Sequence, residues 1–197
     1  MRVIAGSARG RRIVAPPGLD VRPTSERVRQ ATFNALIHRG AVEEARVVDL
    51  FAGSGSLGIE ALSRGARHVT FVESDRVAHR AILDNVGHLG FESQSTVLRS
   101  DVSRWVAGMR DQVDLVFADP PYDFTEWKPL LDALHPMLAH DDAIVVMETG
   151  RVTDVGEQWT IVRQQRYGAT VVTFLARTAV LQPETPTLLS MLESSDA

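Results

Sequence analysis

The fold is decided by VVDLFAGSGSLGIEAL, which spans residues 47–62. Residues 47–50 predict a short buried strand. Gly53, Gly55 and Gly58 follow it in the spacing G-x-G-x-x-G, and a helical pattern comes next. Glycines at this spacing permit a tight turn and the close approach of a ligand to the backbone, and a helix N-terminus presents free N–H groups to that ligand. The stretch therefore predicts a strand, a glycine loop and a helix that meet at a binding site.

Strands and helices continue to alternate after this stretch. We expect strands at 69–72, 96–99, 115–118 and 144–147, and helices at 76–89, 102–107 and 127–138. This alternation favours an α/β fold in which helices cover both faces of a parallel sheet. Two β-rich runs at 159–163 and 170–175 flank Tyr167 and Gly168 and predict a final hairpin.

A separate unit is expected upstream of the main sheet. Apolar runs at 2–5 and 11–15 are separated by a glycine-containing loop and predict a small β-hairpin. A helix is expected to begin at Thr24, as its cap, and to end near Arg39. We therefore divide the chain into an N-terminal hairpin and helix extension (1–40), a main α/β domain (41–177) and a tail (178–197).

The charge of the chain is distributed unevenly. The 197 residues carry a formal net charge of −4, but residues 1–40 hold eight arginines against two acidic residues, which makes this segment +6. The remaining residues hold 13 basic and 23 acidic side chains, a net charge of −10. A basic segment on an acidic body favours a polyanionic partner such as RNA. The candidate RNA contacts are Arg9, Arg11, Arg12 and Arg22. The alternative is an ordinary solvated surface, because arginine replaces lysine everywhere except at Lys128.

The composition excludes several classes of protein. The chain contains no cysteine, which rules out disulfides, thiolate zinc sites and mechanisms that need a cysteine nucleophile. The six histidines are scattered and form no HExxH-type pair, so we expect no metal site. No apolar run approaches the roughly 18 residues of a membrane span, and arginine stands where a signal peptide needs an apolar core. We therefore expect a cytoplasmic protein with no membrane partner.

Carboxylates at the strand ends indicate a nucleoside-bearing cofactor. Glu73 closes the second strand of the main domain, twenty residues after Gly53, where it can accept from both hydroxyls of a ribose. Asp49 lies just before the glycines, where it would repel the diphosphate of a nicotinamide cofactor but suit the ammonium and sulfonium groups of S-adenosylmethionine. Its alternative role is to cap a helix or loop. Asp101 can accept from an adenine amino group, with Val102 beside the ring, and it can also cap the helix that follows.

The motif Asp119-Pro120-Pro121-Tyr122 follows the strand at 115–118 directly. Ligands of a parallel α/β sheet bind beyond the carboxyl ends of its strands, so we expect this motif at the site. The two prolines lock the backbone and remove two N–H donors, which leaves an acceptor-rich loop suited to an exocyclic amino group. Tyr122 offers a flat surface on which an extruded base can stack. The alternative is a proline turn with a core tyrosine.

These motifs together resemble a known family. The glycine loop and Asp119-Pro120-Pro121-Tyr122 are similar to those of Rossmann-like S-adenosylmethionine-dependent methyltransferases that modify exocyclic amines. The segment RVIAGSARGRRIVAPPGLDVRPTSERVRQATFNAL (2–36), with EALSRGA (60–66) and RYGAT (166–170), resembles the RsmD family of bacterial 16S rRNA (guanine(966)-N(2))-methyltransferases. The resemblance covers residues 1–177 and leaves out the tail.

The resemblance implies a Rossmann-like seven-stranded sheet, mostly parallel with a terminal antiparallel hairpin, preceded by a small N-terminal β-hairpin. It also implies that Asp119, Pro120, Pro121 and Tyr122 hold the target base. By position, the residues that bind S-adenosylmethionine are Thr24, Asp49, Phe51, Ala52, Gly53, Ser54, Gly55, Gly58, Glu73, Ser74, Asp101, Val102 and Asp119. Thr24 is included because Arg22-Pro23-Thr24 matches a family segment near the methionyl end of the cofactor, although its alternative role is helix entry.

The implied reaction is methyl transfer to the exocyclic N2 of a guanine in 16S rRNA, within the small ribosomal subunit or an assembly intermediate. We expect a monomer and direct in-line transfer, in which Asp119 and the Pro120 carbonyl orient the amine and stabilise its developing charge. Three alternatives stay open at this point: a DNA adenine-N6 methyltransferase, a nicotinamide oxidoreductase and a catalytically silent ribosome-assembly factor.

Overall fold

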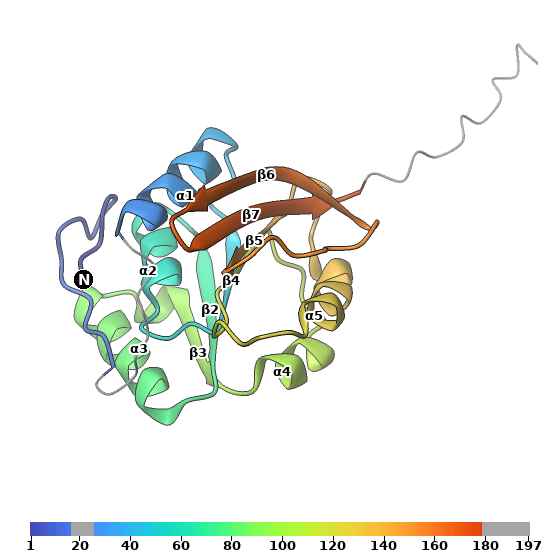
Figure 1. Cartoon of the computed structure of the whole chain (residues 1–197). Coiled ribbons are helices and arrows are strands. Elements are labelled where there is room, and N and C mark those ends of the chain that lie inside the picture. Colours follow the sequence, from blue (N-terminus) through green and yellow to red (C-terminus); the bar gives the residue numbers. More distant parts are fainter. Residues whose placement is uncertain (17–25, 179–197) are drawn as a thin grey trace, which may run out of the picture.

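The computed structural model describes residues 1–16 and 26–178, and its centre is one seven-stranded sheet (Figure 1). The strands are β1 (Arg46–Leu50), β2 (His68–Glu73), β3 (Ser95–Arg99), β4 (Leu115–Ala118), β5 (Ile144–Thr149), β6 (Trp159–Tyr167) and β7 (Thr170–Arg177). They lie side by side in the order β3-β2-β1-β4-β5-β7-β6. The first five in this order are parallel, whereas β7 runs antiparallel to both β5 and β6. The expected α/β class and terminal antiparallel hairpin are confirmed.

Helices cover both faces of this sheet (Figure 1). They are α1 (Glu26–His38), α2 (Ser56–Ser63), α3 (Arg76–Leu89), α4 (Val102–Gly108) and α5 (Trp127–Leu134), with short 3-10 turns at Glu92–Gln94 and His135–Met137. The first three pack on one face, which we call the α1 face, where Phe33, Ile59 and Ile82 share a buried cluster with Phe71 and Phe117 of the sheet. Helices α4 and α5 pack on the opposite α5 face. Within residues 1–16 and 26–178, no helix has the length and apolar character needed to cross a membrane.

Side chains of the central strands alternate between these two faces. In β4, Phe117 is buried on the α1 face and Ala118 on the α5 face. In β5, Val146 is buried on the α1 face and Met147 on the α5 face. Both faces are covered by helices, which explains why these strands read as continuous apolar runs in the sequence.

Strand β6 lies at the edge of the sheet and differs from the central strands. Among residues 1–16 and 26–178 it pairs with β7 alone, and a bulge between Ile161 and Arg163 shifts the register of the pair. Its side chains from 163 to 166 are all exposed. The strand is longer than the expected run at 159–163 because polar residues on a solvent-facing edge continue the pairing as far as Tyr167.

The N-terminal extension departs from the expected β-hairpin. Its described residues form one isolated antiparallel bridge, between Arg2 and Arg12, rather than two paired strands. The pairing stays short because many backbone groups of the extension bond to helices of the main domain instead. Gly6 approaches α2 so closely that a Cβ there would lie 1.6 Å from the Ser63 carbonyl oxygen. The division of the chain at residue 40 stays a prediction, although Val3 is buried in the same cluster as the sheet.

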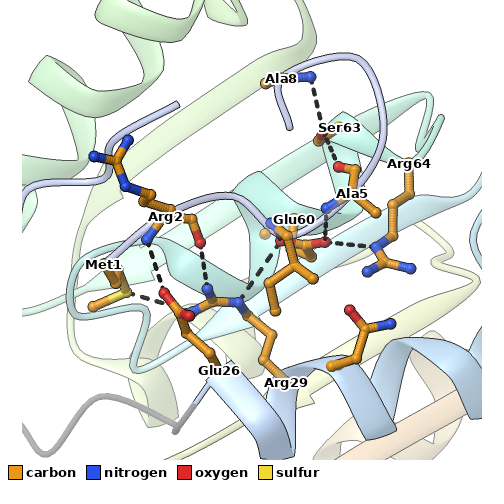
Figure 2. A network of polar contacts seen from close by, with 12 residues as sticks. Met1, Arg2, Ala5, Ala8, Glu26, Arg29, Glu60, Ser63 and Arg64 are labelled. Atoms are coloured by element: carbon orange, nitrogen blue, oxygen red, sulfur yellow. Dashed lines mark hydrogen bonds and ion pairs between the residues drawn. The ribbon is translucent and has the colours of Figure 1, made fainter. Parts of the chain in front are cut away.

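A buried carboxylate fastens the extension to α2 (Figure 2). Glu60 has no exposed surface, and it accepts hydrogen bonds from the backbone N–H groups of Ile4 (2.8 Å) and Ala5 (3.1 Å). It also accepts from Arg64 Nε at 2.6 Å and lies 3.7 Å from Arg29 Nε. Burial lowers the pKa of the Arg29 guanidinium, and the charge of Glu60 opposes that shift. One carboxylate thus joins both described parts of the extension, residues 1–16 and α1, to α2.

A buried amide makes a second connection, from the extension to the glycine loop. Asn85 of α3 accepts from the Val14 N–H and donates to the Val14 carbonyl, both at 2.9 Å. The same side chain donates to the Ser54 carbonyl at 3.0 Å. Ser54 lies between the glycines that follow β1, so the extension and that loop share one hydrogen-bonding group.

Candidate active site

A cavity of about 720 Å³ opens beyond the carboxyl ends of β1, β2, β4 and β5. This is the edge at which parallel α/β sheets bind ligands, and the volume lies within the roughly 300–1,000 Å³ typical of small-molecule sites. The lining consists of Phe51 and Gly53 after β1, Glu73, Ser74 and Asp75 at the end of β2, residues 119–125 after β4, Trp127 of α5, and residues 148–151 and 153 at the end of β5. The structure therefore brings the glycine loop and the Asp119–Tyr122 motif to one cavity.

Four carboxylates lie at this edge, one from each of the four strand ends. They belong to Asp49, Glu73, Asp119 and Glu148. In each case the residue two positions earlier is buried on the α1 face. Because side chains two residues apart in extended backbone point to the same side, all four carboxylates face the α1 side of the sheet. The site is therefore acidic and suits a cationic ligand better than a phosphate.

Glu73 holds the glycine loop in place. Its Oε2 accepts from the Gly53 N–H at 2.8 Å, and its Oε1 accepts from the Asp75 N–H at 2.8 Å. Each oxygen keeps a lone pair with which it can accept from a ligand hydroxyl. The turn needs left-handed backbone at Gly53 (φ +56°) and Gly55 (φ +76°), and Phe51 adopts the same region (φ +57°) without being glycine. A non-glycine residue held in left-handed backbone costs on the order of 1–3 kcal/mol of stability, and such residues cluster at functional sites.

Asp49 lies beneath the loop and caps α2. Its Oδ2 accepts from the N–H of Gly58, the third residue of the helix, whereas the cap residue Gly55 has no side chain that could do so. The carboxyl is 2% exposed and does not line the cavity. Burial raises the pKa of Asp49 well above its usual range; the Gly58 N–H opposes this rise, and the charges of Asp119 and Glu73 add to it. An acidic group at this helix N-terminus disfavours the diphosphate of a nicotinamide dinucleotide.

The third glycine of the motif serves helix packing. A Cβ on Gly58 would lie 2.3 Å from the Phe71 ring and 2.7 Å from Val69 Cγ1, so only glycine lets α2 approach β2 this closely. Ala52, Ser54 and Gly55 form the turn behind Gly53 and do not line the cavity.

Aromatic rings support the loop that follows β4. The loop folds back on itself, because the Phe124 N–H donates to the Pro121 carbonyl at 2.9 Å. The Phe124 ring packs edge-on between Phe51 and Trp127, with centroid separations of 5.3 and 5.1 Å. These three rings line the cavity and connect the loops after β1 and β4 to α5.

Tyr122 is not a core residue. Its side chain is 65% exposed at the cavity mouth, which removes the alternative of a buried structural tyrosine. A Cβ on Gly150 would lie 3.2 Å from the Tyr122 ring, so the ring extends toward the end of β5. An exposed ring at the rim of an acceptor-lined cavity can stack on a planar ligand.

Other predicted cofactor residues lie elsewhere or outside the described residues. Asp101 accepts from the Arg104 N–H at 3.0 Å as the cap of α4, and Val102 is buried on the α5 face. Neither of the two lines the cavity. Thr24 and Arg22 lie outside the described residues.

The basic extension divides into two kinds of arginine. Arg9, Arg11 and Arg12 are all exposed, but only Arg11 of the three has hydrogen bonds to a helix end among the described residues. Arg11 donates from both guanidinium nitrogens to carbonyls at the end of α3, those of His88 and Leu89. A cation satisfies the unpaired carbonyls of a helix C-terminus, so the structure gives Arg11 a role in holding the extension.

S-adenosylmethionine fits the donor set of the cavity. Its ammonium and sulfonium groups suit the acidic strand ends, and its ribose suits the free lone pairs of Glu73. Across residues 1–16 and 26–178, no group of three His, Asp or Glu side chains is arranged to hold a metal ion.

Comparison with known proteins agrees with this geometry. The sequence pattern of the family described as conserved hypothetical protein 95 matches residues 1–176. YlbH of Bacillus subtilis, whose name marks it as a candidate rRNA methyltransferase, is 35% identical over 87% of this chain and 96% of its own length. Ribosomal RNA small subunit methyltransferase D of Haemophilus influenzae is 32% identical over 85% of this chain and 89% of its own length. The chain belongs to the RsmD family.

Membership of the RsmD family makes this protein an S-adenosylmethionine-dependent methyltransferase. The solved structure of yhhF from Escherichia coli is 31% identical and has a TM-score of 0.81, over 91% of this chain and 99% of that protein. The seven-stranded sheet is thus the fold of the family.

The sequence interpretation of this RsmD-family protein missed part of the cavity. The missed lining residues are Asp75, Asp123, Phe124, Thr125, Trp127, Glu148, Thr149, Gly150, Arg151 and Thr153. Half of them follow or end β5. The signal that could have found these is positional, because Glu148 comes directly after the expected strand at 144–147, as Asp119 does after 115–118.

Proposed function

We propose that this protein transfers a methyl group from S-adenosylmethionine to the exocyclic N2 of a guanine of 16S rRNA, in the small ribosomal subunit or an assembly intermediate. The observation that carries the proposal is the convergence of the glycine loop and Asp119-Pro120-Pro121-Tyr122 on one acidic cavity. The names of relatives such as ribosomal RNA small subunit methyltransferase D support rRNA as the substrate rather than DNA. A ribosomal substrate would place the protein in the cytoplasm.

The cofactor would be held by the strand ends and the loop between β1 and α2. Glu73 would accept from the ribose hydroxyls, while Phe51, Gly53 and Ser74 would line the nucleoside. Asp49 would act through the field of its carboxylate and through the position it imposes on α2. Bound S-adenosylmethionine supplies an electrophilic methyl group on a positively charged sulfur.

The chain's own residues would position the guanine that receives the methyl group. The Tyr122 ring would stack on the base, and the Pro120 carbonyl would accept from its amino group. Asp119 would accept the second N–H of that group and stabilise the positive charge that develops on nitrogen as its lone pair attacks. The amine becomes acidic as the bond forms, so solvent at the open cavity mouth could take the proton.

The extension (1–40) would face the RNA. Arg9 and Arg12 are exposed on it and would contact phosphates without reading sequence. Arg22 belongs to the same proposal, although it lies outside the described residues.

Mass spectrometry of 16S rRNA from a strain that lacks this protein tests the proposal. We expect the loss of one N2-methylguanine, and its recovery when the wild-type protein is supplied. Asp119→Asn should fail to restore it and should lower transfer to small subunits by about 10²- to 10³-fold. Asp111→Asn removes the same charge from an exposed position before β4 and should restore it. If the RNA of the deletion strain is unchanged and purified protein methylates adenine in DNA, the proposal is wrong. If the cofactor binds but no substrate is methylated, a role in assembly takes its place.

A further inference from the structure

A second carboxylate stands beside Asp119 in the cavity, and the reaction as proposed does not use it. The last register pair of the neighbouring strands β4 and β5 joins Ala118 to Met147, and the next residue of each strand is Asp119 and Glu148. Adjacent parallel strands lie about 4.8 Å apart, so these two positions are neighbours at the same level of the sheet. Both residues line the cavity.

The side chain of Glu148 points the same way as that of Asp119. Glu148 pairs in register with Val172 of β7, which is buried on the α1 face, and Val146, two residues earlier, is buried there too. Glu148 is partly exposed, whereas Thr149 next to it is buried. The two carboxylates therefore form an acceptor pair at the edge of the cavity, beside the ring of Tyr122 at Gly150.

Such a pair matches the hydrogen-bonding edge of guanine that carries N2. Guanine presents two donors side by side there, the N2 amino group and the N1–H. Adenine presents a donor and a lone pair, the N6 amino group and N1. A carboxylate accepts and cannot donate, so it attracts an N1–H and repels an N1 lone pair.

We propose that Glu148 is the specificity-determining residue of this site, and that it accepts the N1–H of the target guanine while Asp119 and the Pro120 carbonyl hold the N2 amino group. The inference rests on the proposed function and adds the reason why guanine is chosen over adenine. A hydrogen bond to a charged group corresponds to about 10- to 100-fold in kcat/KM.

A base analogue tests this contact. 2-Aminopurine keeps the amino group at C2 but has a lone pair at N1 in place of the N–H and a hydrogen at C6 in place of the carbonyl oxygen, so the change of preference between wild type and a Glu148 variant, rather than the preference alone, reports the contact of Glu148. A synthetic fragment with guanine or 2-aminopurine at the target position would be ligated into 16S rRNA and reconstituted into small subunits. The measurement is the ratio of kcat/KM for guanine to that for 2-aminopurine, because a purely structural effect of a mutation changes both rates alike.

We expect wild-type protein to favour guanine and Glu148→Gln to lower the ratio at least 10-fold, since the glutamine amide can donate to the N1 lone pair. Glu148→Asp keeps the carboxylate and should keep the wild-type preference at a reduced rate. Glu157→Gln removes the same charge from an exposed position outside the cavity and serves as the matched control, with an unchanged ratio. Melting temperature and calorimetric binding of S-adenosylmethionine verify that each variant is folded.

The outcomes separate this inference from the function on which it rests. An unchanged ratio in folded Glu148→Gln refutes the role of Glu148 but leaves guanine methylation intact. A wild-type protein that methylates neither base in small subunits overturns the proposed function itself. Equal wild-type rates on guanine and 2-aminopurine also refute the inference, because the site would then be indifferent to the N1–H.

Discussion

Replacement of Glu60 by alanine would test whether the buried carboxylate holds the N-terminal extension on the sheet. Glu60 accepts from the backbone N–H groups of Ile4 and Ala5 and pairs with the guanidiniums of Arg29 and Arg64. The Glu60 and Arg29 side chains have no exposed surface, so Glu60→Ala leaves a buried cation and two backbone donors without this acceptor.

The size of the effect follows from burial. Removal of one partner from a buried ion pair costs about 3–5 kcal/mol of unfolding free energy, which in a chain of this length lowers Tm by about 6–20 °C. The matched control is Asp84→Ala, because Arg80 and Asp84 form an ion pair with the same i,i+4 spacing as Glu60 and Arg64. Their side chains are 73% and 60% exposed, so the expected loss is only about 0.3–0.5 kcal/mol.

The assay combines urea denaturation with hydrogen exchange. Denaturation gives the unfolding free energies of wild type, Glu60→Ala and Asp84→Ala. Exchange at the Ile4 and Ala5 amides reports whether the extension has detached locally. If Glu60→Ala costs no more than Asp84→Ala, and these two amides keep their protection, then the carboxylate does not hold the extension and the reasoning fails.

Three further predictions concern the loop, the helix behind it and the basic extension. The pKa of Asp49 is raised in the folded protein. Its protonation therefore contributes fully to stability below the usual aspartate pKa of about 4, and this contribution is lost as pH rises through the folded pKa. The unfolding free energy of Asp49→Asn should consequently decline less with rising pH than that of wild type. Bound cationic S-adenosylmethionine favours the ionised form of Asp49, so in the pH range where Asp49 titrates, binding should release more protons from wild type than from Asp49→Asn. Calorimetry in buffers of different ionisation enthalpy measures this release, and equal release across that pH range would contradict the coupling. Gly58→Ala should cost about 1–3 kcal/mol in denaturation, because the Cβ overlaps the Phe71 ring, and an unchanged midpoint would show that α2 can shift. Simultaneous replacement of Arg9 and Arg12 by alanine should weaken RNA binding and lower the slope of log affinity against log salt by about 2, and an unaltered slope would make these residues ordinary surface.

Local sequence patterns were sufficient for the sheet and for eight of the eighteen residues that line the cavity. The glycine spacing at 53–58 and the Pro-Pro motif after 115–118 each encode backbone geometry within a few residues, so a single sequence reveals them. The position of Glu148 directly after its strand is visible in the sequence, but its place beside Asp119 depends on the pairing of β4 with β5, which the sequence of neither strand specifies.

The buried ion pairs were missed for a related reason. Glu60 is a charged residue in a helix, a type usually exposed to solvent, and its backbone partners lie 56 and 55 residues earlier in the chain. One of the same bonds accounts for the short pairing of the extension: the N–H of Ala5, which would continue the pairing after Val3, bonds to Glu60 of α2 instead.

The open edge at β6 has a consequence for how the protein behaves at high concentration. An edge strand with unpaired amides and carbonyls can pair with a strand of another molecule. Here the bulge between Ile161 and Arg163 interrupts the regular hydrogen-bond spacing that an added strand would need. The guanidiniums of Arg163 and Arg166 also repel the same edge strand of a second copy of the protein. Replacement of Arg163 and Arg166 by valine would remove this repulsion, make the edge strand more apolar and favour fibre-like self-association.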